Sequence, residues 1–147
     1  MNRIRAASVT TGGLLAGLTL LAGEYVLNIL ILGKDMAGAA QGFEHLAGRL
    51  TVPLLAANTL ALGVVIVWLY AALHLQFGAG LKSVLLAAMI VWFLAWFHCA
   101  VVTSALGVLP PGSFWATAGW GLVEVPAAAL AGAWLYRRLA EKEKPQQ

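Results

Sequence analysis

Four long apolar runs constrain this chain more than any other feature. Each has the length of about 20 mostly apolar residues that a helix needs to cross the hydrocarbon core of a bilayer. They cover approximately residues 7–32, 52–73, 84–106 and 114–136 in a chain of 147 residues. Inside a bilayer the backbone amides must be hydrogen-bonded within the protein, and runs of this length achieve that as helices. The runs therefore predict an all-α membrane protein with four transmembrane helices.

The composition agrees with this interpretation and excludes other classes of protein. Apolar residues make up 61% of the chain and charged residues 10%, whereas a soluble domain carries about 25% charged residues. No basic surface with interleaved aromatic residues indicates a nucleic-acid partner, so the expected partner is the lipid bilayer. The single cysteine, Cys99, excludes an internal disulfide. We expect one transmembrane domain over residues 1–138 and a charged cytoplasmic tail over residues 139–147.

Lysine and arginine residues predict the orientation of the helices. Seven of them flank one side of the predicted bundle and two flank the other, and such an excess marks the cytoplasmic side. The seven are Arg3, Arg5, Lys82, Arg137, Arg138, Lys142 and Lys144, and the two are Lys34 and Arg49. This pattern predicts an up-down-up-down bundle with both termini in the cytoplasm. The first outer loop, residues 34–50, has apolar residues near one face, which predicts a short helix at the membrane surface.

Polar side chains inside the apolar runs are the candidate functional residues. A buried charge is costly there, about 2.5–3.5 kcal/mol for Asp at a helix centre, so it usually has a reason. Glu24 and Glu124 lie in the first and fourth runs, and Asn58 and His98 lie in the second and third. At a rise of about 1.5 Å per residue, these four residues fall at a similar depth in the outer half of the bundle. Asn28, one turn after Glu24, shares its helix face.

Small residues near both glutamates predict where the helices pack most closely, because two backbones can approach in lipid where side chains are small. These residues share a face with Glu24 or Glu124, and they are Gly13, Gly17, Gly121, Ala128 and Gly132. Pro126 removes a backbone hydrogen bond within the fourth helix and predicts a kink there. We therefore expect both glutamates to point into the bundle.

Helical spacing separates the polar and aromatic residues of the third run. At about 100° per residue, His98 shares a face with Val91 and Ala95, whereas Trp92 and Trp96 point elsewhere. We expect His98 to face the other helices and the two tryptophans to face lipid.

Three interpretations of the polar cluster are compatible with the sequence. In the first, its side chains only hold the helices together, at about 0.6 kcal/mol per contact. In the second, Glu24, His98 and Glu124 bind protons, a cation or a small ligand. In the third, the same three residues form a metal, haem or catalytic site, since carboxylates and imidazole are metal ligands. No cofactor motif occurs, so no cofactor is predicted.

Three segments carry a resemblance to a known group of proteins. Residues 23–28 (GEYVLN) and 120–126 (WGLVEVP), together with residues 68–70 (WLY), resemble small bacterial four-span proteins described as hypothetical membrane proteins. The likeness covers most of the chain and implies the four-helix architecture and a bacterial inner-membrane location, with no catalytic roles. A glutamate in the first of four short helices is also similar to the small multidrug resistance transporters. The second glutamate and the fixed charge bias depart from that pattern, so this likeness is an analogy.

The function expected from the sequence is therefore that of an integral inner-membrane protein that binds protons, a cation or a small ligand at its Glu/His cluster. The alternative is a non-catalytic accessory subunit that dimerises, or docks a membrane-protein partner, through its glycine-rich helix faces. An enzyme is disfavoured, because no nucleophile, base and orienting group share a face.

Overall fold

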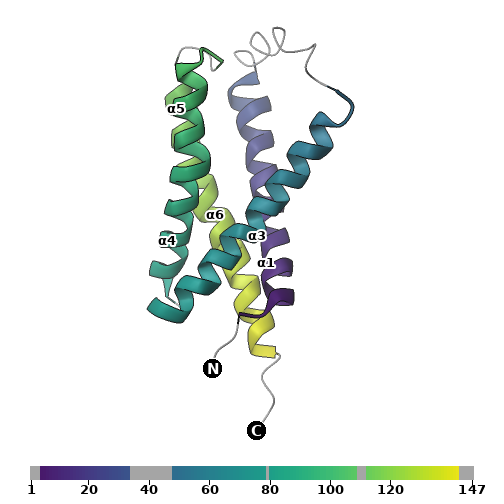
Figure 1. Cartoon of the computed structure of the whole chain (residues 1–147), viewed down its shortest axis with the longest axis vertical. Helices are drawn as coiled ribbons and strands as arrows, with labels where there is room; N and C mark the ends of the chain where they lie inside the picture. The colour runs from purple at the N-terminus through teal and green to yellow at the C-terminus, as the bar shows by residue number, and fades with distance from the viewer. Residues whose placement is uncertain (1–3, 34–47, 79, 109–111, 143–147) are drawn as a thin grey trace.

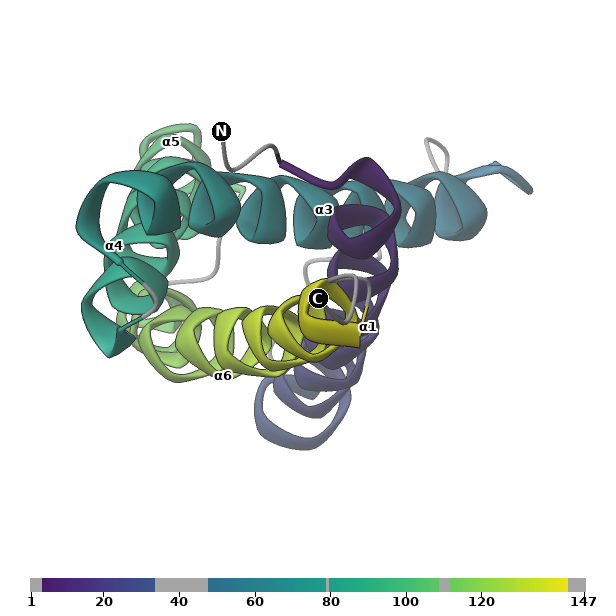
Figure 2. The ribbon, with the colours of Figure 1, turned by 90° about the horizontal axis from the view of Figure 1, so that it is seen from below.

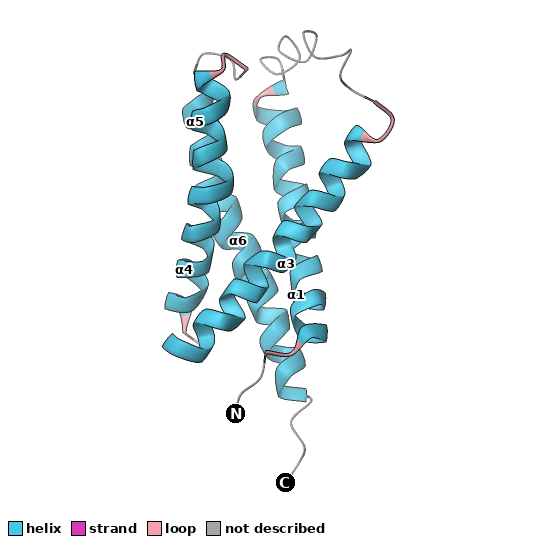
Figure 3. Ribbon diagram, in the orientation of Figure 1, coloured by secondary structure: helices cyan, strands magenta, loops and turns pink. Residues whose placement is uncertain are grey.

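The computed structural model describes residues 4–33, 48–78, 80–108 and 112–142, and this part of the chain is helical with no strand (Figure 3). Two of the spans contain π-helical segments, in which each hydrogen bond reaches five residues instead of four. The first span is α1 (Ala6–Tyr25) followed by π-helical η1 (Val26–Ile31), and the second is α3 (Thr51–Phe77). The third is α4 (Leu81–Val91), π-helical η3 (Trp92–Phe97) and α5 (His98–Ala105), and the fourth is α6 (Ser113–Lys142).

All four spans are long and apolar enough to cross a membrane, as the sequence predicts. Two ends differ from the prediction. The second span continues to Phe77, and α6 continues to Lys142, so that residues 139–142 are helix and not tail. Arg5 Nη1 donates a hydrogen bond to the carbonyl oxygen of Ala140 at 3.2 Å, which ties this last turn to the start of α1. The predicted surface helix falls mainly on residues 34–47, which lie outside the described residues.

The four spans are arranged as a ring. Seen from below, α3 and α6 form opposite sides, α1 lies between them at one end and α4 lies between them at the other (Figure 2). The start of α1 and the end of α6 lie at the same end of the molecule (Figure 1). Helix α1 is therefore placed to contact both α3 and α6.

Glycines make both of these contacts close. A Cβ atom on Gly63 of α3 would lie 2.2 Å from the backbone nitrogen of Gly17, and one on Gly12 would lie 2.7 Å from the carbonyl oxygen of Gly132 in α6. Real Cβ atoms do not approach other atoms within 3.0 Å, so these positions require glycine. Small residues at helix crossings are typical of membrane bundles, where van der Waals packing replaces the hydrophobic effect.

The small residues predicted to mark the closest packing are buried within this chain. They are Gly13, Gly17, Gly121, Ala128 and Gly132. Gly13 and Gly17 face α3, and Gly132 faces both α1 and α3. Because helices of the same chain already cover these positions, they present no open glycine face to a partner.

The two halves of the bundle are packed differently. We define the closed half as residues 4–23, 63–91 and 125–142, and the open half as residues 24–33, 51–62, 92–105 and 113–124. The large contiguous cluster of buried hydrophobic residues lies in the closed half, apart from Trp96. The open half buries only a few more hydrophobic side chains, which are Leu27, Leu32, Ala100 and Ala118. Within α3 the buried residues begin at Gly63, and the preceding part of α3 runs away from the other helices (Figure 1). The open half therefore has room for a cavity.

Candidate functional site

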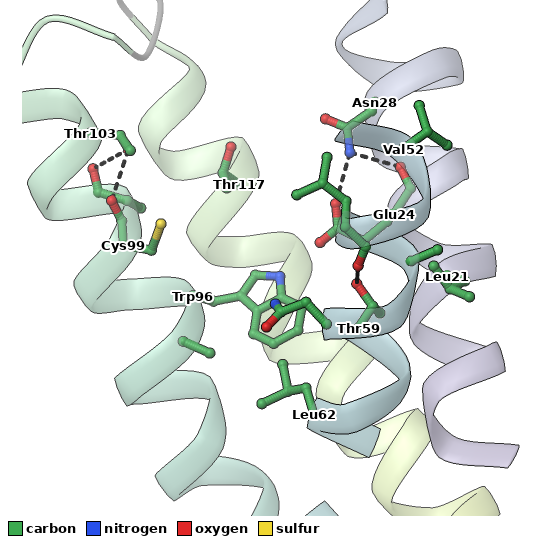
Figure 4. Close-up of a pocket in the computed structure, with 15 residues that line it drawn as sticks. Leu21, Glu24, Asn28, Val52, Thr59, Leu62, Trp96, Cys99, Thr103 and Thr117 are labelled. Carbon is green, nitrogen blue, oxygen red and sulfur yellow. Dashed lines mark hydrogen bonds between the residues drawn. The ribbon is translucent and has the colours of Figure 1, made fainter. Parts of the chain in front are cut away.

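A pocket of about 590 Å³ lies in the open half, between all four spans (Figure 4). Pockets for small molecules typically have about 300–1,000 Å³ and mostly apolar walls with a few polar groups. The first span contributes Leu21, Glu24 and Asn28. The rest of the lining comes from α3 (Val52, Leu55, Ala56, Asn58, Thr59, Leu62), from η3 and α5 (Ala95, Trp96, Cys99, Ala100, Thr103) and from Thr117 of α6. Glu24 is the only carboxylate among these lining residues, and no lysine or arginine is among them.

Asn28 holds the carboxylate of Glu24. Its Nδ2 donates to Glu24 Oε2 at 2.7 Å and to the backbone oxygen of Glu24 at 2.9 Å. Residues four apart lie on the same face of a helix, so the predicted common face of these two residues is confirmed. The chain also enters η1 here, and the amide of Leu32 donates to the carbonyl of Leu27 at 2.8 Å. The carboxylate is thus positioned by a donor from its own helix.

Trp96 reaches into the bundle, contrary to the prediction that it faces lipid. It is buried, and a Cβ atom on Gly121 of α6 would lie 2.6 Å from its Cδ1. Figure 4 shows its indole projecting from the third span toward the middle of the pocket, and the indole lies beside the Glu24 carboxyl group. Trp92 also turns inward, and its Nε1 donates to the carbonyl of Ala118 at 2.9 Å.

His98 lies on the outside of the bundle, so its predicted place in the cluster is wrong. Its side chain is exposed and does not line the pocket. The reason is η3, because a π-helical turn holds more residues than an α turn and rotates everything that follows. From Val91 onward, the buried positions in this span are Val91, Trp96 and Ala100, whereas regular α spacing from Val91 leads to Ala95 and His98.

Glu124 is buried, as predicted, but it lies beside the pocket instead of lining it. Its side chain is 5% exposed, and a Cβ atom on Gly23 would lie 2.3 Å from its Oε1. Neither of its carboxylate oxygens has a hydrogen-bond partner among the described residues. Gly23 precedes Glu24 in the chain, so the carboxyl group of Glu124 packs on α1 beside Glu24, at the contact between α1 and α6.

The structure also bears on the three interpretations of the cluster. Asn58 lines the pocket from α3, as predicted, but His98 is absent from it. In the described ranges, no group of three or more His, Cys, Asp or Glu side chains could hold a metal ion, and the proposed trio of Glu24, His98 and Glu124 is not assembled. The Asn28–Glu24 hydrogen bond stays within one span, so it does not join two helices.

Pro126 lies inside α6, which continues as one helix from Ser113 to Lys142. Leu122, whose carbonyl the proline ring leaves without its usual partner, has an exposed side chain on the outside of the helix. The predicted kink stays a prediction.

Sequence reasoning missed Trp96 and the apolar residues of α3 beside Asn58 as walls of the pocket. One available signal was the position of Trp96 in the interior of a span, since membrane tryptophans usually collect at the two interfaces. For the walls that α3 contributes, such as Leu55 and Leu62, we find no signal in the apolar pattern.

Comparisons with family models, with curated proteins and with solved structures found no match. The function is therefore argued from the residues of this chain.

Proposed function

We propose that this chain is a multi-pass membrane protein that binds a small organic cation in the pocket at Glu24. The observation that carries the proposal is a carboxylate in a mostly apolar pocket whose described lining residues include no lysine or arginine. An acidic side chain at membrane depth usually pairs with a positive group or serves a ligand pathway. A cationic ligand would supply the missing positive charge.

The other walls favour an organic cation over a bare metal ion. The pocket of about 590 Å³ is much larger than an ion, and its lining offers one carboxylate rather than a set of ligands. Trp96 lies beside Glu24, and an indole face attracts cations by about 0.5–2 kcal/mol. Leucine and alanine side chains would contact the apolar groups of the ligand. A proton, or a small ligand that is neutral or negative, fits this combination of one carboxylate, an indole and apolar walls less well than an organic cation does.

The membrane placement is part of the proposal. We propose an up-down-up-down bundle in a bacterial inner membrane, with both termini in the cytoplasm and a surface helix in the first outer loop. The excess of lysine and arginine beside the start of α1 and the end of α6 supports this orientation. At that end Arg138 lies 4.3 Å from the ring centroid of Trp134, a pair suited to a membrane interface. A reporter that is active only in the cytoplasm, fused to the C-terminus, should be active; an inactive fusion of a stably produced protein would contradict the orientation.

Titration calorimetry tests the binding site directly. We expect purified protein in detergent to bind benzyltrimethylammonium, a cation whose charge does not change with pH. Glu24→Gln should weaken binding more than tenfold, because it removes the only carboxylate among the described residues that line the pocket. Glu141→Gln is the matched control, since Glu141 is exposed at the end of α6. Equal affinity of Glu24→Gln and the wild type, or no binding by the wild type, would overturn the proposal.

A further inference from the structure

Glu124 is a buried acid that the proposed cation site does not use. It is 5% exposed and neither carboxylate oxygen has a partner within the described residues. Most buried polar side-chain atoms in proteins have a hydrogen-bond partner, and each exception needs an explanation. Here the carboxyl group is pressed onto the backbone of Gly23, the residue just before Glu24.

The two carboxyl groups have unequal surroundings. Glu24 accepts a hydrogen bond from Asn28, whereas Glu124 accepts none from the described residues. Two neighbouring carboxylates away from water cannot both be ionised at low cost, and such pairs share one proton. The proton therefore belongs on Glu124, and the negative charge belongs on Glu24, where an amide donor stabilises it.

Among the described residues of the neighbouring spans, no charged group other than Glu24 lies beside Glu124. From α1 the facing titratable group is Glu24. The adjacent part of α3, residues 51–62, contains no titratable residue. In the third span Lys82 stands at the far end, His98 is exposed, and Cys99 lines the pocket.

A hydrogen-bond donor for the ionised form of Glu124 is close by. Trp120 lies four residues earlier on α6, which is the same helix face. Its Nε1 is buried and has no partner among the residues described. An ionised Glu124 could therefore accept a hydrogen bond from this indole.

We propose that Glu124 carries a proton that is exchanged for the cation bound at Glu24. When the cation binds, the O–H bond of Glu124 breaks, the electron pair stays on the carboxylate and the proton leaves to water. The bound cation then balances the second negative charge. This inference rests on the proposed cation site and adds proton exchange to it.

The experiment measures binding of benzyltrimethylammonium between pH 6 and 8, in buffers with different heats of ionisation. For the wild type we expect release of close to one proton per cation and affinity that increases up to about tenfold per pH unit, as linkage requires. Glu124→Gln should bind without proton release and with affinity independent of pH. Glu141→Gln should behave as the wild type. Binding by the wild type without proton release, or unchanged release in Glu124→Gln, would overturn the exchange and leave the cation site standing.

An infrared difference spectrum keeps the inference testable if Glu124→Gln does not fold. In the wild type, addition of the cation should remove the band of a protonated carboxyl group, because Glu124 loses its proton. A spectrum without that loss, in a sample that binds the cation, would contradict the proposal. Absence of cation binding by the wild type would overturn the cation site and this inference together.

Discussion

The closed and open halves of the bundle are built from similar apolar helices but differ in how closely these helices pack. In the closed half, glycines such as Gly17 and Gly63 bring backbones into direct contact. In the open half the first turns of α3 bury no residue, and both π-helical segments occur there. π-helical turns occur frequently at functional sites. The position of the small residues therefore decides where the helices pack closely and where a cavity remains.

The largest effect should come from adding a methyl group to the closed half. In Gly63→Ala the new Cβ would lie 2.2 Å from the nitrogen of Gly17. Backbone cannot move aside as a side chain can, so we expect a loss of about 1–3 kcal/mol in unfolding free energy. Thermal unfolding in detergent measures it. Gly119→Ala is the control, because nothing lies within 4 Å of that position. Equal stability of the two variants would contradict the division into halves.

A smaller loss should follow from Trp92→Phe. The change removes the hydrogen bond from Nε1 to the carbonyl of Ala118, which joins η3 to α6 in the open half. We expect a loss of about 0.5–1.5 kcal/mol in unfolding free energy. The same substitution at Trp115, which is 76% exposed, should cost less. If the two variants unfold at the same temperature, the open half does not depend on this contact.

Asn28→Ala should affect binding more than stability. It removes the donor that positions the Glu24 carboxylate, and hydrogen bonds in membrane proteins contribute about 0.6–1.7 kcal/mol. We expect cation affinity to fall by about threefold to tenfold, with little change in thermal unfolding. Thr19→Ala serves as the control, since that hydroxyl bonds only to Leu15 of its own helix in the described structure. Unchanged affinity in Asn28→Ala would show that the amide does not prepare the site.

The smallest effect should come from His98→Ala. An exposed side chain outside the pocket should change stability by less than about 0.5 kcal/mol and leave cation affinity unchanged. Calorimetry and thermal unfolding together check this. A loss of binding comparable to that of Glu24→Gln would show that His98 belongs to the binding site, and it would contradict the described geometry of η3.

The candidate site could be predicted only in part. Glu24 and Asn28 share a face because they lie four residues apart, and that relation depends on one helix alone. Glu124 was predicted to be buried because small residues recur beside it on α6. Helical spacing predicts that His98 faces the other helices and that Trp96 faces lipid, whereas the structure has the reverse. The spacing assumes α geometry, and η3 is π-helical.

The sequence alone determined the number of spans, their approximate ends and the acids within them, because length, apolarity and charge are local properties of the chain. The tertiary structure decided which side chains meet. Two π-helical segments rotate the ends of their spans, and the crossing at Gly63 lets the start of α3 leave the bundle. Both effects depend on contacts between distant residues, so no periodic pattern in one helix could reveal the pocket or place Glu124 against Gly23.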